Sequence, residues 1–526
     1  MQKMTNNQKN NQTTIGLKRY KIEYVIFTAG IVCALLKHWN DKINLIENKY
    51  FETFKLISIL VSIILSSIVL YKLQKTSLNN SQFRCHGDEG LFCTILLPAA
   101  FIFNCLQYND VISPAYKIIT IISIETSYTM VMTLIYTNER KMYLLVINLI
   151  IITLLALITQ IWPIVLILSI ICQTSFILLL HSVSVIFSKS FTIGELHLVC
   201  QGIVLFLSAC VFHFHKLITE PVNTIHDTLH EVNTVISITL TGLMVIFLSL
   251  KLVPILKTPI YFYTVCVLIE VGLTFIIMYA ALRQNPLVWL LNYLLNTHQR
   301  IIFVSYLFIC IASTIAFTIW QNIDRKSSKL KRKIFHIIII IVYIPGFYMD
   351  VELLLLSSAG MIAIFLTLEC LRFLNIPPLG KIIQDNITLF LDEKDCGLLI
   401  VSHIYLLVGS TISLWINPCH QVSLSIMSGV LAIGFGDSVA AFVGILWGKH
   451  KWPNSMKTYE GTIGAFFVQY LITLLIFYFT NKNVFNIYNS IYVLTVTVFA
   501  VLFEAFTTQF DNLVLPLYLY VMLIFI

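Results

Sequence analysis

Residues 164–187 read IVLILSIICQTSFILLLHSVSVIF and contain no Asp, Glu, Lys or Arg. About 20 apolar residues are enough for an α-helix to cross the hydrocarbon core of a bilayer. Similar runs recur along the chain of 526 residues, of which 58% are hydrophobic and 11% are charged. Because soluble proteins are about 25% charged, this composition excludes an ordinary soluble enzyme. It predicts an all-α, polytopic membrane protein with about 15–17 transmembrane helices.

The apolar runs place the expected spans along the chain. The first follows a polar tail and has no small-residue cleavage site behind it, so we expect an uncleaved signal anchor. The expected spans lie near residues 22–38, 54–71, 91–107, 117–136, 142–160, 164–187, 197–215, 232–250, 259–282, 301–320, 334–348, 353–373, 398–418, 421–447, 461–479, 489–507 and 512–526.

The net charge of +8 comes from 34 Lys and Arg against 26 Asp and Glu. A basic balance can indicate a nucleic-acid partner, but in a membrane protein it is typical of positive-inside topology, so no nucleic acid is expected. If the spans alternate from a cytoplasmic N-terminus, most basic residues fall on the cytoplasmic side, including the stretch 325–333. The 12 cysteines form no CxxC pair, and we interpret them as small core residues rather than a disulfide framework or a zinc site.

Polar residues are distributed unevenly along the chain. Before residue 321 the loops carry little that could do chemistry, whereas later polar residues cluster at the ends of apolar runs. We therefore expect an N-terminal transmembrane bundle of unassigned role, residues 1–320, and a catalytic transmembrane domain, residues 321–526. Glu125 and Glu270 lie in apolar runs of the first part and receive no role.

The densest group of polar residues lies in residues 434–462, GFGDSVAAFVGILWGKHKWPNSMKTYEGT. Small residues recur every four positions from Gly436 to Gly448, which makes a smooth ridge that another helix can approach closely. Asp437 lies inside the apolar run, where an ionised carboxylate is costly and usually functional.

A short loop follows Gly448 and carries groups that suit a phosphate chain. Ammonium groups, hydroxyl donors and freed backbone N–H groups bind phosphate oxygens, and the start of the helix after Thr458 adds positive dipole toward an anion. Glu460 could hold a metal ion or cap that helix. Neither GxxxxGK[ST] nor GxGxxG occurs, so a nucleotide would bind outside the common folds. The basic and hydroxyl side chains of this loop are Lys449, Lys451, Lys457, Ser455, Thr458 and Thr462.

This segment resembles the CTP-binding segment of the dolichol kinases and, more distantly, that of the phosphatidate cytidylyltransferase and phytol kinase group. Four further motifs resemble dolichol kinase elements in the same order. They are Arg332–His336, Leu368–Arg372, Leu391–Gly397 with Ser402–Gly409, and Glu504–Pro516.

Simpler interpretations of these motifs stay open. Arg332 and His336 share a helix face at i, i+4, so they either contact a phosphate or flank a span. Glu369 and Arg372, at i, i+3, are expected to form an ion pair. His403 is either functional or a packed neutral histidine.

The other acidic motifs are equally open. Residues 392–395 are either functional or a solvated loop. Glu504, Thr508 and Asp511 are spaced as on one helical face, and an intramembrane Glu beside such neighbours is typical of a functional site. Span counting places every motif on the cytoplasmic side.

The resemblance implies a CTP-dependent dolichol kinase in the endoplasmic reticulum membrane, with its active site facing the cytoplasm, that supplies dolichyl phosphate for protein glycosylation. It implies Asp437, Lys457 and Asp511 as catalytic residues and Asp437, Glu460 and Asp511 as ligands of Mg²⁺. Dolichol or a related polyprenol and the lipid bilayer are the implied partners, and no oligomeric state is predicted. The implied CTP-binding residues are Gly448, Lys449, His450, Lys451, Trp452, Pro453, Asn454, Ser455, Met456, Lys457, Thr458, Tyr459, Glu460, Gly461, Thr462 and Ile463.

Two other classes of protein fit part of this pattern. One is a related CTP enzyme that acts on phytol, diacylglycerol or phosphatidate. The other is a membrane transporter, because many spans with buried acids also describe carriers. A carrier predicts an inverted repeat, and no internal repeat is found.

Overall fold

The computed structural model describes residues 22–38, 83–84, 89–108, 111–135, 164–219, 228–324, 329–387, 391–392, 394–419, 422–453, 455–480 and 485–526. Secondary structure in these ranges is helical, and the extended segments among them pair only at an isolated antiparallel bridge between Lys451 and Thr458. Nine helices of the described ranges are long and apolar enough to cross a membrane. The prediction of an all-α, polytopic membrane protein is confirmed.

The described helices follow the predicted spans closely. Residues 22–38 are helical, and each later predicted span in the described ranges coincides with a helix or a run of adjoining helices. The predicted spans near 54–71 and 142–160 lie outside the described residues. Three short helices of the described ranges were not predicted: the 3-10 helix η3 (Pro254–Lys257), α11 (Pro286–Leu295) and α15 (Leu379–Ile387).

Contacts divide the chain into two compact units. Unit 1 consists of Met1–Leu205, Ile412–Cys419 and Ser423–Ile526. It contains the helix at 22–38 and the first half of α7 (Ile193–Thr219). Its other helices are α3 (Cys93–Gln107), α4 (Pro114–Ile135), α6 (Ile164–Ile186), the π-helix η6 (Val430–Asp437), α17 (Ser438–Leu446), α18 (Tyr459–Thr480), α19 (Ile487–Phe506) and α20 (Asp511–Leu523).

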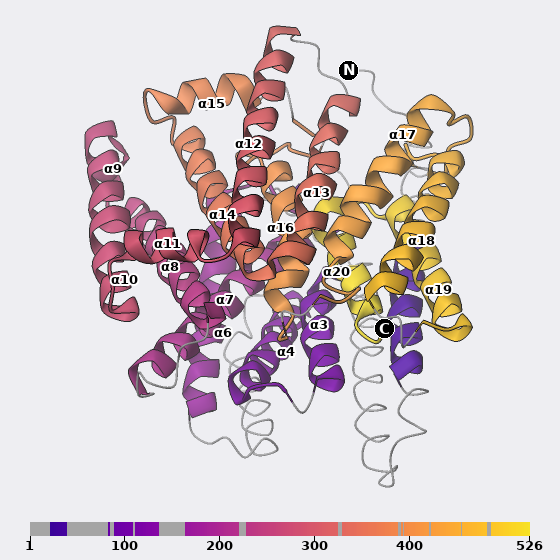
Figure 1. Cartoon of the computed structure of the whole chain (residues 1–526), viewed down its shortest axis with the longest axis horizontal. Helices are drawn as coiled ribbons and strands as arrows, with labels where there is room; N and C mark the ends of the chain where they lie inside the picture. The colour runs from indigo at the N-terminus through magenta and orange to yellow at the C-terminus, as the bar shows by residue number, and fades with distance from the viewer. Residues whose placement is uncertain are drawn as a thin grey trace. The chain divides into compact units, whose positions relative to one another are not determined.

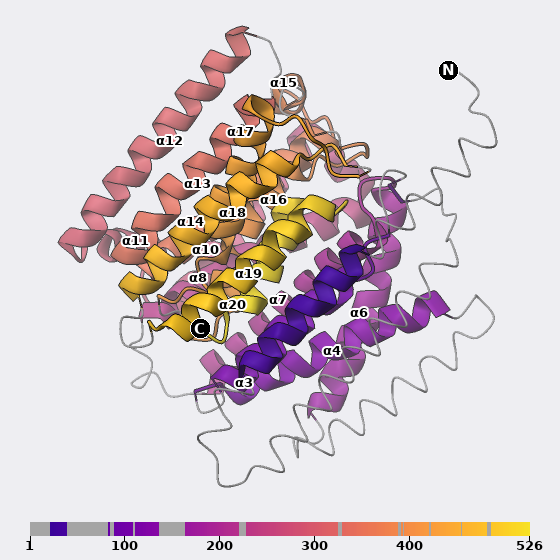
Figure 2. The ribbon, with the colours of Figure 1, turned by 90° about the vertical axis from the view of Figure 1, so that its right-hand side faces the viewer.

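The glycine ridge of residues 436–448 packs against α18, which lies beside α17 in both views (Figures 1 and 2). A Cβ atom added to Gly461 would lie 2.5 Å from the carbonyl oxygen of Ala440 and 3.3 Å from the Cα of Gly444. The two backbones therefore approach to a distance that only glycine allows. This close packing holds the loop between α17 and α18 at a fixed position.

Unit 2 consists of Phe206–Thr411 and His420–Val422. Two of its helices, α13 (Lys329–Met349) and α14 (Val351–Phe373), contain the polar motifs at residues 332–336 and 368–372. Its helices are the second half of α7, α8 (Thr228–Leu252), η3 (Pro254–Lys257), α9 (Pro259–Cys266), η4 (Val267–Leu273), α10 (Thr274–Leu282), α11, α12 (His298–Asp324), α13 (Lys329–Met349), α14 (Val351–Phe373), α15 and most of α16 (Ser402–Ile416).

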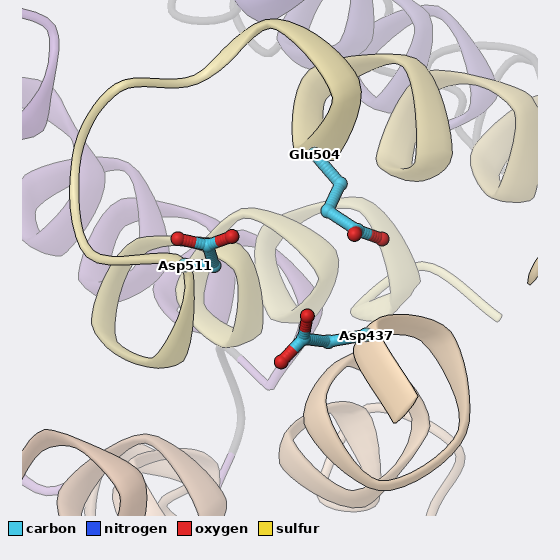
Figure 3. A group of neighbouring side chains, drawn as sticks. All are labelled: Asp437, Glu504 and Asp511. Atoms are coloured by element: carbon cyan, nitrogen blue, oxygen red, sulfur yellow. The ribbon is translucent and has the colours of Figure 1, made fainter. Parts of the chain in front are cut away.

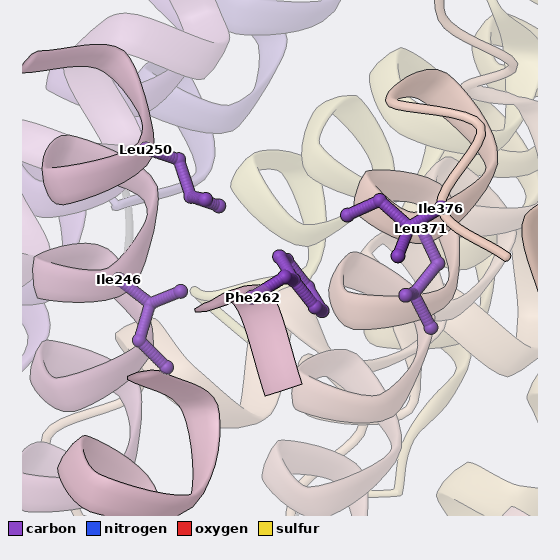
Figure 4. Close-up of a cluster of buried hydrophobic side chains, with 5 residues drawn as sticks. All are labelled: Ile246, Leu250, Phe262, Leu371 and Ile376. Atoms are coloured by element: carbon purple, nitrogen blue, oxygen red, sulfur yellow. The ribbon is translucent and has the colours of Figure 1, made fainter. Parts of the chain in front are cut away.

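A hydrophobic cluster fixes the end of α14 in unit 2 (Figure 4). Phe262 of α9 lies between Ile246 and Leu250 of α8 on one side and Leu371 and Ile376 on the other, and all five are buried. Burial of aliphatic and aromatic side chains of this size contributes about 1.5–3 kcal/mol each. The cluster therefore holds Leu371 in place, and with it the part of α14 that carries Glu369 and Arg372.

The boundaries between the two contact-defined units differ from the predicted domain boundary at residue 321. Unit 1 joins residues before 206 to residues after 422, and it holds the segment 434–462 together with residues 504–511. Unit 2 holds the motifs at 332–336, 368–372 and 391–397. The division into a bundle of unassigned role and a catalytic part concerns function and stays a prediction.

Candidate active site

Three carboxylates meet in unit 1 (Figure 3). Asp437 ends the π-helix η6, Glu504 lies in the last turn of α19, and Asp511 is the first residue of α20. One ligand atom from each lies within 4.8 Å of the other two. Asp437 and Glu504 are buried and Asp511 is half-buried, so this is a concentrated negative charge that needs a cation.

Breaks in the helices bring these side chains together. The helix α19 ends at Phe506, the chain turns through residues 507–510, and α20 begins at Asp511. The prediction that Glu504 and Asp511 share one continuous helical face is therefore wrong, although the turn still places both carboxylates together. On the opposite element, Asp437 closes a π-helix, a widened turn that is frequent at functional sites.

Lys457 supplies a cation to this group. Its ammonium nitrogen lies 2.8 Å from Asp511 Oδ2, 3.5 Å from Glu504 Oε1 and 2.6 Å from the Glu504 carbonyl oxygen. Burial acts to lower the pKa of Lys457, but the charges of Asp511, Glu504 and Asp437 outweigh it and raise that pKa above its ordinary value. Lys457 is therefore a permanent ammonium facing three carboxylates.

The loop between α17 and α18 folds back on itself to present Lys457. The Trp452 backbone N–H donates to the Lys457 carbonyl at 2.9 Å, and the Lys457 backbone N–H donates to Ser455 Oγ at 3.2 Å. Ser455 Oγ in turn donates to the Ala505 carbonyl at 3.4 Å, beside Glu504. This loop is thus tied to the end of α19 and does not hang free in solvent.

Aromatic side chains brace the same loop. The Trp452 ring lies 3.9 Å from the Tyr459 ring and 5.1 Å from the Phe506 ring, measured between centroids. Its indole N–H donates to Thr462 Oγ1 at 2.8 Å. Trp452 therefore joins the loop to both α18 and α19, and we interpret it as a scaffold residue of the site.

The predicted nucleotide-binding residues separate into two groups by exposure. Trp452, Ser455, Lys457, Thr458, Glu460 and Thr462 are half-buried and Gly461 is buried. Gly448 is half-buried, whereas Lys449, His450, Lys451, Pro453, Met456, Tyr459 and Ile463 are exposed. Asn454 lies outside the described residues. The exposed basic residues are free to meet a ligand that approaches from solvent.

Glu460 has a different environment from the three carboxylates. It accepts hydrogen bonds from the His450 backbone N–H at 3.2 Å and from His450 Nδ1 at 2.7 Å. Thr458 Oγ1 accepts the Gly461 N–H at 3.1 Å, so Thr458 caps α18. In the part of the chain described, the geometry groups Glu504, not Glu460, with the aspartates. The sequence indicated a functional role for Glu504 but did not predict it as a metal ligand.

The predicted ion pair of unit 2 is confirmed. Glu369 Oε1 lies 2.6 Å from Arg372 Nη2 and also accepts the Ile400 N–H at 2.7 Å. Arg372 further donates to Gln384 Oε1 at 2.8 Å and to the Leu398 carbonyl at 2.7 Å. A hollow of about 530 Å³ lies beside it, lined by Arg372, Phe373, Asn375, Lys381, Gln384 and Leu398. These partners hold the Arg372 guanidinium in place in this structure.

The acidic loop after α15 is also tied into unit 2. Asp395 accepts the backbone N–H groups of Asp392 and Val401, both at 3.1 Å, and burial raises the pKa of Asp395. Asp392 pairs with Arg332 at 3.2 Å. The His403 ring packs edge-on against Phe365. Asp392 and Asp395 of the described residues are therefore held by named partners, and Arg332 faces a carboxylate in this structure.

The donor set at Asp437, Glu504 and Asp511 fits Mg²⁺. Mg²⁺ prefers oxygen ligands and is usually held by one or two carboxylates, with substrate phosphates and water completing its coordination. Three carboxylates against one ammonium leave a formal charge of −2 within the described group, which a divalent cation would balance. The buried, crowded acids are difficult to explain by packing alone.

The fold and this group define a class: a polytopic α-helical membrane protein with a carboxylate and lysine centre suited to a metal–phosphate ligand. Comparison with known proteins gives the family. A family model described as dolichol kinase matches residues 135–423, more than half of the chain. The chain belongs to the dolichol kinase family.

Curated relatives come from distant organisms. Dolichol kinase of Homo sapiens is 34% identical over 358 residues, and the match covers 64% of this chain and 65% of the human protein. Dolichol kinase of Saccharomyces cerevisiae is 32% identical over 241 residues, 45% of this chain and 44% of the yeast protein. The matched region thus spans 65% or less of these relatives. No solved structure matches the chain significantly.

The extent of the family match differs from that of the sequence motifs. It includes residues 135–320, where no motif was recognised, and it ends before Gly434. The carboxylate and lysine centre thus rests on the motifs and on geometry.

Proposed function

We propose that this protein is a dolichol kinase of the endoplasmic reticulum membrane that transfers the terminal phosphate of CTP to dolichol. The observation that carries the proposal is the Lys457 ammonium, held 2.8 Å from Asp511 within a group of three carboxylates. Phosphoryl transfer requires mainly positioning and charge neutralisation, and this arrangement offers both kinds of charge. Family membership supports dolichol as the acceptor. The resemblance of residues 434–462 to the CTP-binding segment of dolichol kinases supports CTP as the donor.

The lysines of the loop would bind the phosphate chain. Lys449 and Lys451 are exposed and can meet the phosphates as they arrive from water. Lys457 lies deeper, against Glu504 and Asp511, so its ammonium can reach the phosphoryl group that is transferred. The positive end of α18 adds to this field.

Asp437, Glu504 and Asp511 would hold Mg²⁺. When bound, Mg²⁺ neutralises the phosphate oxygens and aligns the donor. The Lys457 ammonium, which lies beside these carboxylates, would direct its charge to the phosphate.

The reaction itself needs an acceptor oxygen and a proton acceptor. The dolichol hydroxyl oxygen forms a bond to the terminal phosphorus while the bond from that phosphorus to the bridging oxygen of CTP breaks. The hydroxyl proton passes to a carboxylate, for which Asp437 is our choice because it is a buried acid on a separate element, η6; Glu504 and Asp511 would then hold the metal. CDP leaves, and dolichyl phosphate remains in the membrane for use in protein glycosylation.

The position of the protein in the membrane suits a lipid substrate. The isoprenoid chain of dolichol stays among apolar helices and the bilayer, while its hydroxyl reaches the polar end of the bundle. Span counting places residues 448–460 and Asp511 on the cytoplasmic side, where CTP is present. Two helices, α18 and α19, separate these elements, which supports a common side.

The test is a transfer assay with purified full-length protein. CTP labelled at the γ-position, CTP labelled at the α-position and γ-labelled ATP are each incubated with dolichol, phytol, diacylglycerol or phosphatidate. We expect label in dolichyl phosphate from γ-labelled CTP alone. Label from the α-position would identify a cytidylyltransferase, equal use of ATP would remove the nucleotide assignment, and preference for another lipid would replace the substrate.

A further inference from the structure

The turn that carries Asp511 is held by residues far away in the sequence. Thr192 Oγ1 donates to Gln509 Oε1 at 2.5 Å, and Glu195 Oε1 accepts the Phe510 backbone N–H at 2.9 Å. Both contacts join the start of α7 to residues 507–510, directly before Asp511. All of these residues belong to unit 1.

Thr192 and Glu195 are themselves fixed by a capping box at the start of α7. Thr192 Oγ1 accepts the Glu195 N–H at 3.2 Å, and Glu195 Oε2 accepts the Thr192 N–H at 3.2 Å. Such a reciprocal pair satisfies two N–H groups that a helix start leaves without a partner. The same two side chains therefore serve the helix start and the turn before Asp511.

A buried arginine completes the arrangement. Arg84 Nη2 lies 2.8 Å from Glu195 Oε1, and the exposed fractions of the two side chains are 1% and 0%. The Arg84 guanidinium also lies 4.7 Å from the centre of the Phe510 ring. Arg84 thus contacts the aromatic ring of Phe510, while Glu195 accepts the backbone N–H of Phe510. Removing one member would leave an uncompensated buried charge.

The packing leaves little room for the turn to move. Gln509 is fully buried. Gly90, at φ +63°, lies so close that an added Cβ atom would be 2.4 Å from the Gln509 side chain. Gly194 donates its N–H to the Glu89 carbonyl at 2.8 Å, which ties this neighbouring segment to α7. The turn is therefore enclosed on its backbone, its Gln509 side chain and its Phe510 ring.

We propose that Thr192, Glu195 and Arg84 are positioning residues that set the place of Asp511 within the carboxylate group. The inference rests on the proposed function, in which Asp511 binds the divalent cation. It gives a task to residues before position 321. Glu504 and Asp511 flank the turn on its two sides, so a shift of the turn changes their separation and hence the affinity for a cation.

The experiment compares purified full-length variants in detergent. Thr192→Val removes the hydroxyl with little change in volume, and Thr192→Ser restores it. Glu195→Gln removes the charge that faces Arg84. The matched control is Asp350→Asn in unit 2, because Asp350 also caps a helix, α14, and pairs with an arginine, Arg300. Asp511→Asn identifies signals that come from the carboxylate group.

Three quantities are measured: Mn²⁺ affinity by electron paramagnetic resonance without nucleotide, hydrogen exchange of the Phe510 amide, and kcat with KM for CTP and dolichol. For Thr192→Val and Glu195→Gln we expect weaker Mn²⁺ binding and lower kcat, each on the order of tenfold, with an unchanged KM for dolichol and faster exchange at Phe510. Thr192→Ser should resemble the wild type. Asp350→Asn should lower only the unfolding temperature.

Wild-type Mn²⁺ affinity and kcat per folded molecule in both Thr192→Val and Glu195→Gln would overturn the proposal and leave a purely structural role. If Glu195→Gln does not fold, Thr192→Val alone decides. A wild-type protein that binds Mn²⁺ at Asp511 but transfers no phosphate from CTP would refute the proposed function. In that case the Mn²⁺ and exchange measurements still decide whether these residues position Asp511.

Discussion

The Lys457 ammonium and the Asp511 carboxylate lie 2.8 Å apart although 54 residues separate them in the sequence. Two long helices, α18 and α19, lie between them along the chain and pack against each other. The contact therefore depends on the length and packing of both helices. In the proposed function, a lysine held in this way would serve as an internal counter-ion of the carboxylates until another cation and a phosphate bind.

Lys457→Met should separate the two tasks of this lysine. We expect kcat to fall by about 10²–10³-fold, since one preorganised charge for the transferred phosphate is lost. We also expect Mn²⁺ to bind more tightly, because three carboxylates no longer share an ammonium. Transfer assays and Mn²⁺ titration measure the two effects. The control is Lys451→Met, an exposed lysine of the same loop, with a smaller effect on kcat and none on Mn²⁺. Unchanged kcat in Lys457→Met would refute its role.

The composition of the metal site can be tested with two glutamates. Glu504 is buried beside Asp437 and Asp511, whereas Glu460 holds His450. Glu504→Gln should therefore raise the Mg²⁺ concentration needed for half-maximal activity about tenfold or more, and Glu460→Gln should leave it nearly unchanged. Activity measured across a Mg²⁺ series gives both values. A larger effect of Glu460→Gln than of Glu504→Gln would show that Glu460, and not Glu504, is the metal ligand.

The charge of Lys457 predicts how its contribution to protein stability depends on pH. Its pKa is raised, so its contribution to stability is fully present below the ordinary lysine value of about 10.4 and is lost only as pH rises through the higher folded value. The difference in unfolding temperature between wild type and Lys457→Met should stay constant from about pH 6.5 to about pH 9.5. A difference that shrinks within this window would show that Lys457 loses its proton there.

Much of the fold was predictable because each span is a local property of the sequence. The run at residues 164–187 identified α6 without any knowledge of its neighbours, since length and the absence of charge decide whether a helix can cross a bilayer. The ridge from Gly436 to Gly448 likewise predicted close helix packing. The short helix α15 was not predicted because the spans were identified as long apolar runs. Its apolar residues Leu379, Ile382, Ile383 and Ile387 follow a helical period, but nine residues are too few to cross a bilayer.

The site was only partly predictable because its members are brought together by tertiary structure. The sequence pointed to Asp437, Lys457 and Asp511, and the structure places these three side chains together. It also favoured Glu460 over Glu504 as a ligand, since Glu460 stands in the basic loop. The turn between Phe506 and Asp511 instead brings Glu504 beside the two aspartates, and which glutamate binds the metal stays a prediction. No local pattern could have linked Glu195 to Phe510, because that contact spans 315 residues.

The approach of α17 and α18 can be tested with one methyl group. Gly461→Ala would place a Cβ atom 2.5 Å from the Ala440 carbonyl oxygen, so the helices must move apart. We expect destabilisation of about 1–3 kcal/mol. Gly202→Ala is the matched control: Gly202 lies inside α7, and its added Cβ meets nothing within 4 Å, so the gain in helix propensity should leave stability equal or higher. Thermal unfolding in detergent measures both; equal stabilities would exclude the close contact.

The final prediction concerns which side of the membrane the site faces. Met456, in the loop before α18, is 72% exposed, and Ile487, at the start of α19, is 81% exposed. Because the single long helix α18 separates them, they should lie on opposite sides of the membrane, with Met456 in the cytoplasm according to the distribution of basic residues.

Single cysteines at these two positions, in a chain without its native cysteines, are probed with an impermeant maleimide on sealed microsomes. Position 456 should react at once and position 487 only after permeabilisation. The opposite pattern would place the loop in the lumen, away from cytoplasmic CTP, and the proposed function would then have to be abandoned. Equal labelling of both positions before permeabilisation would mean that α18 does not cross the membrane.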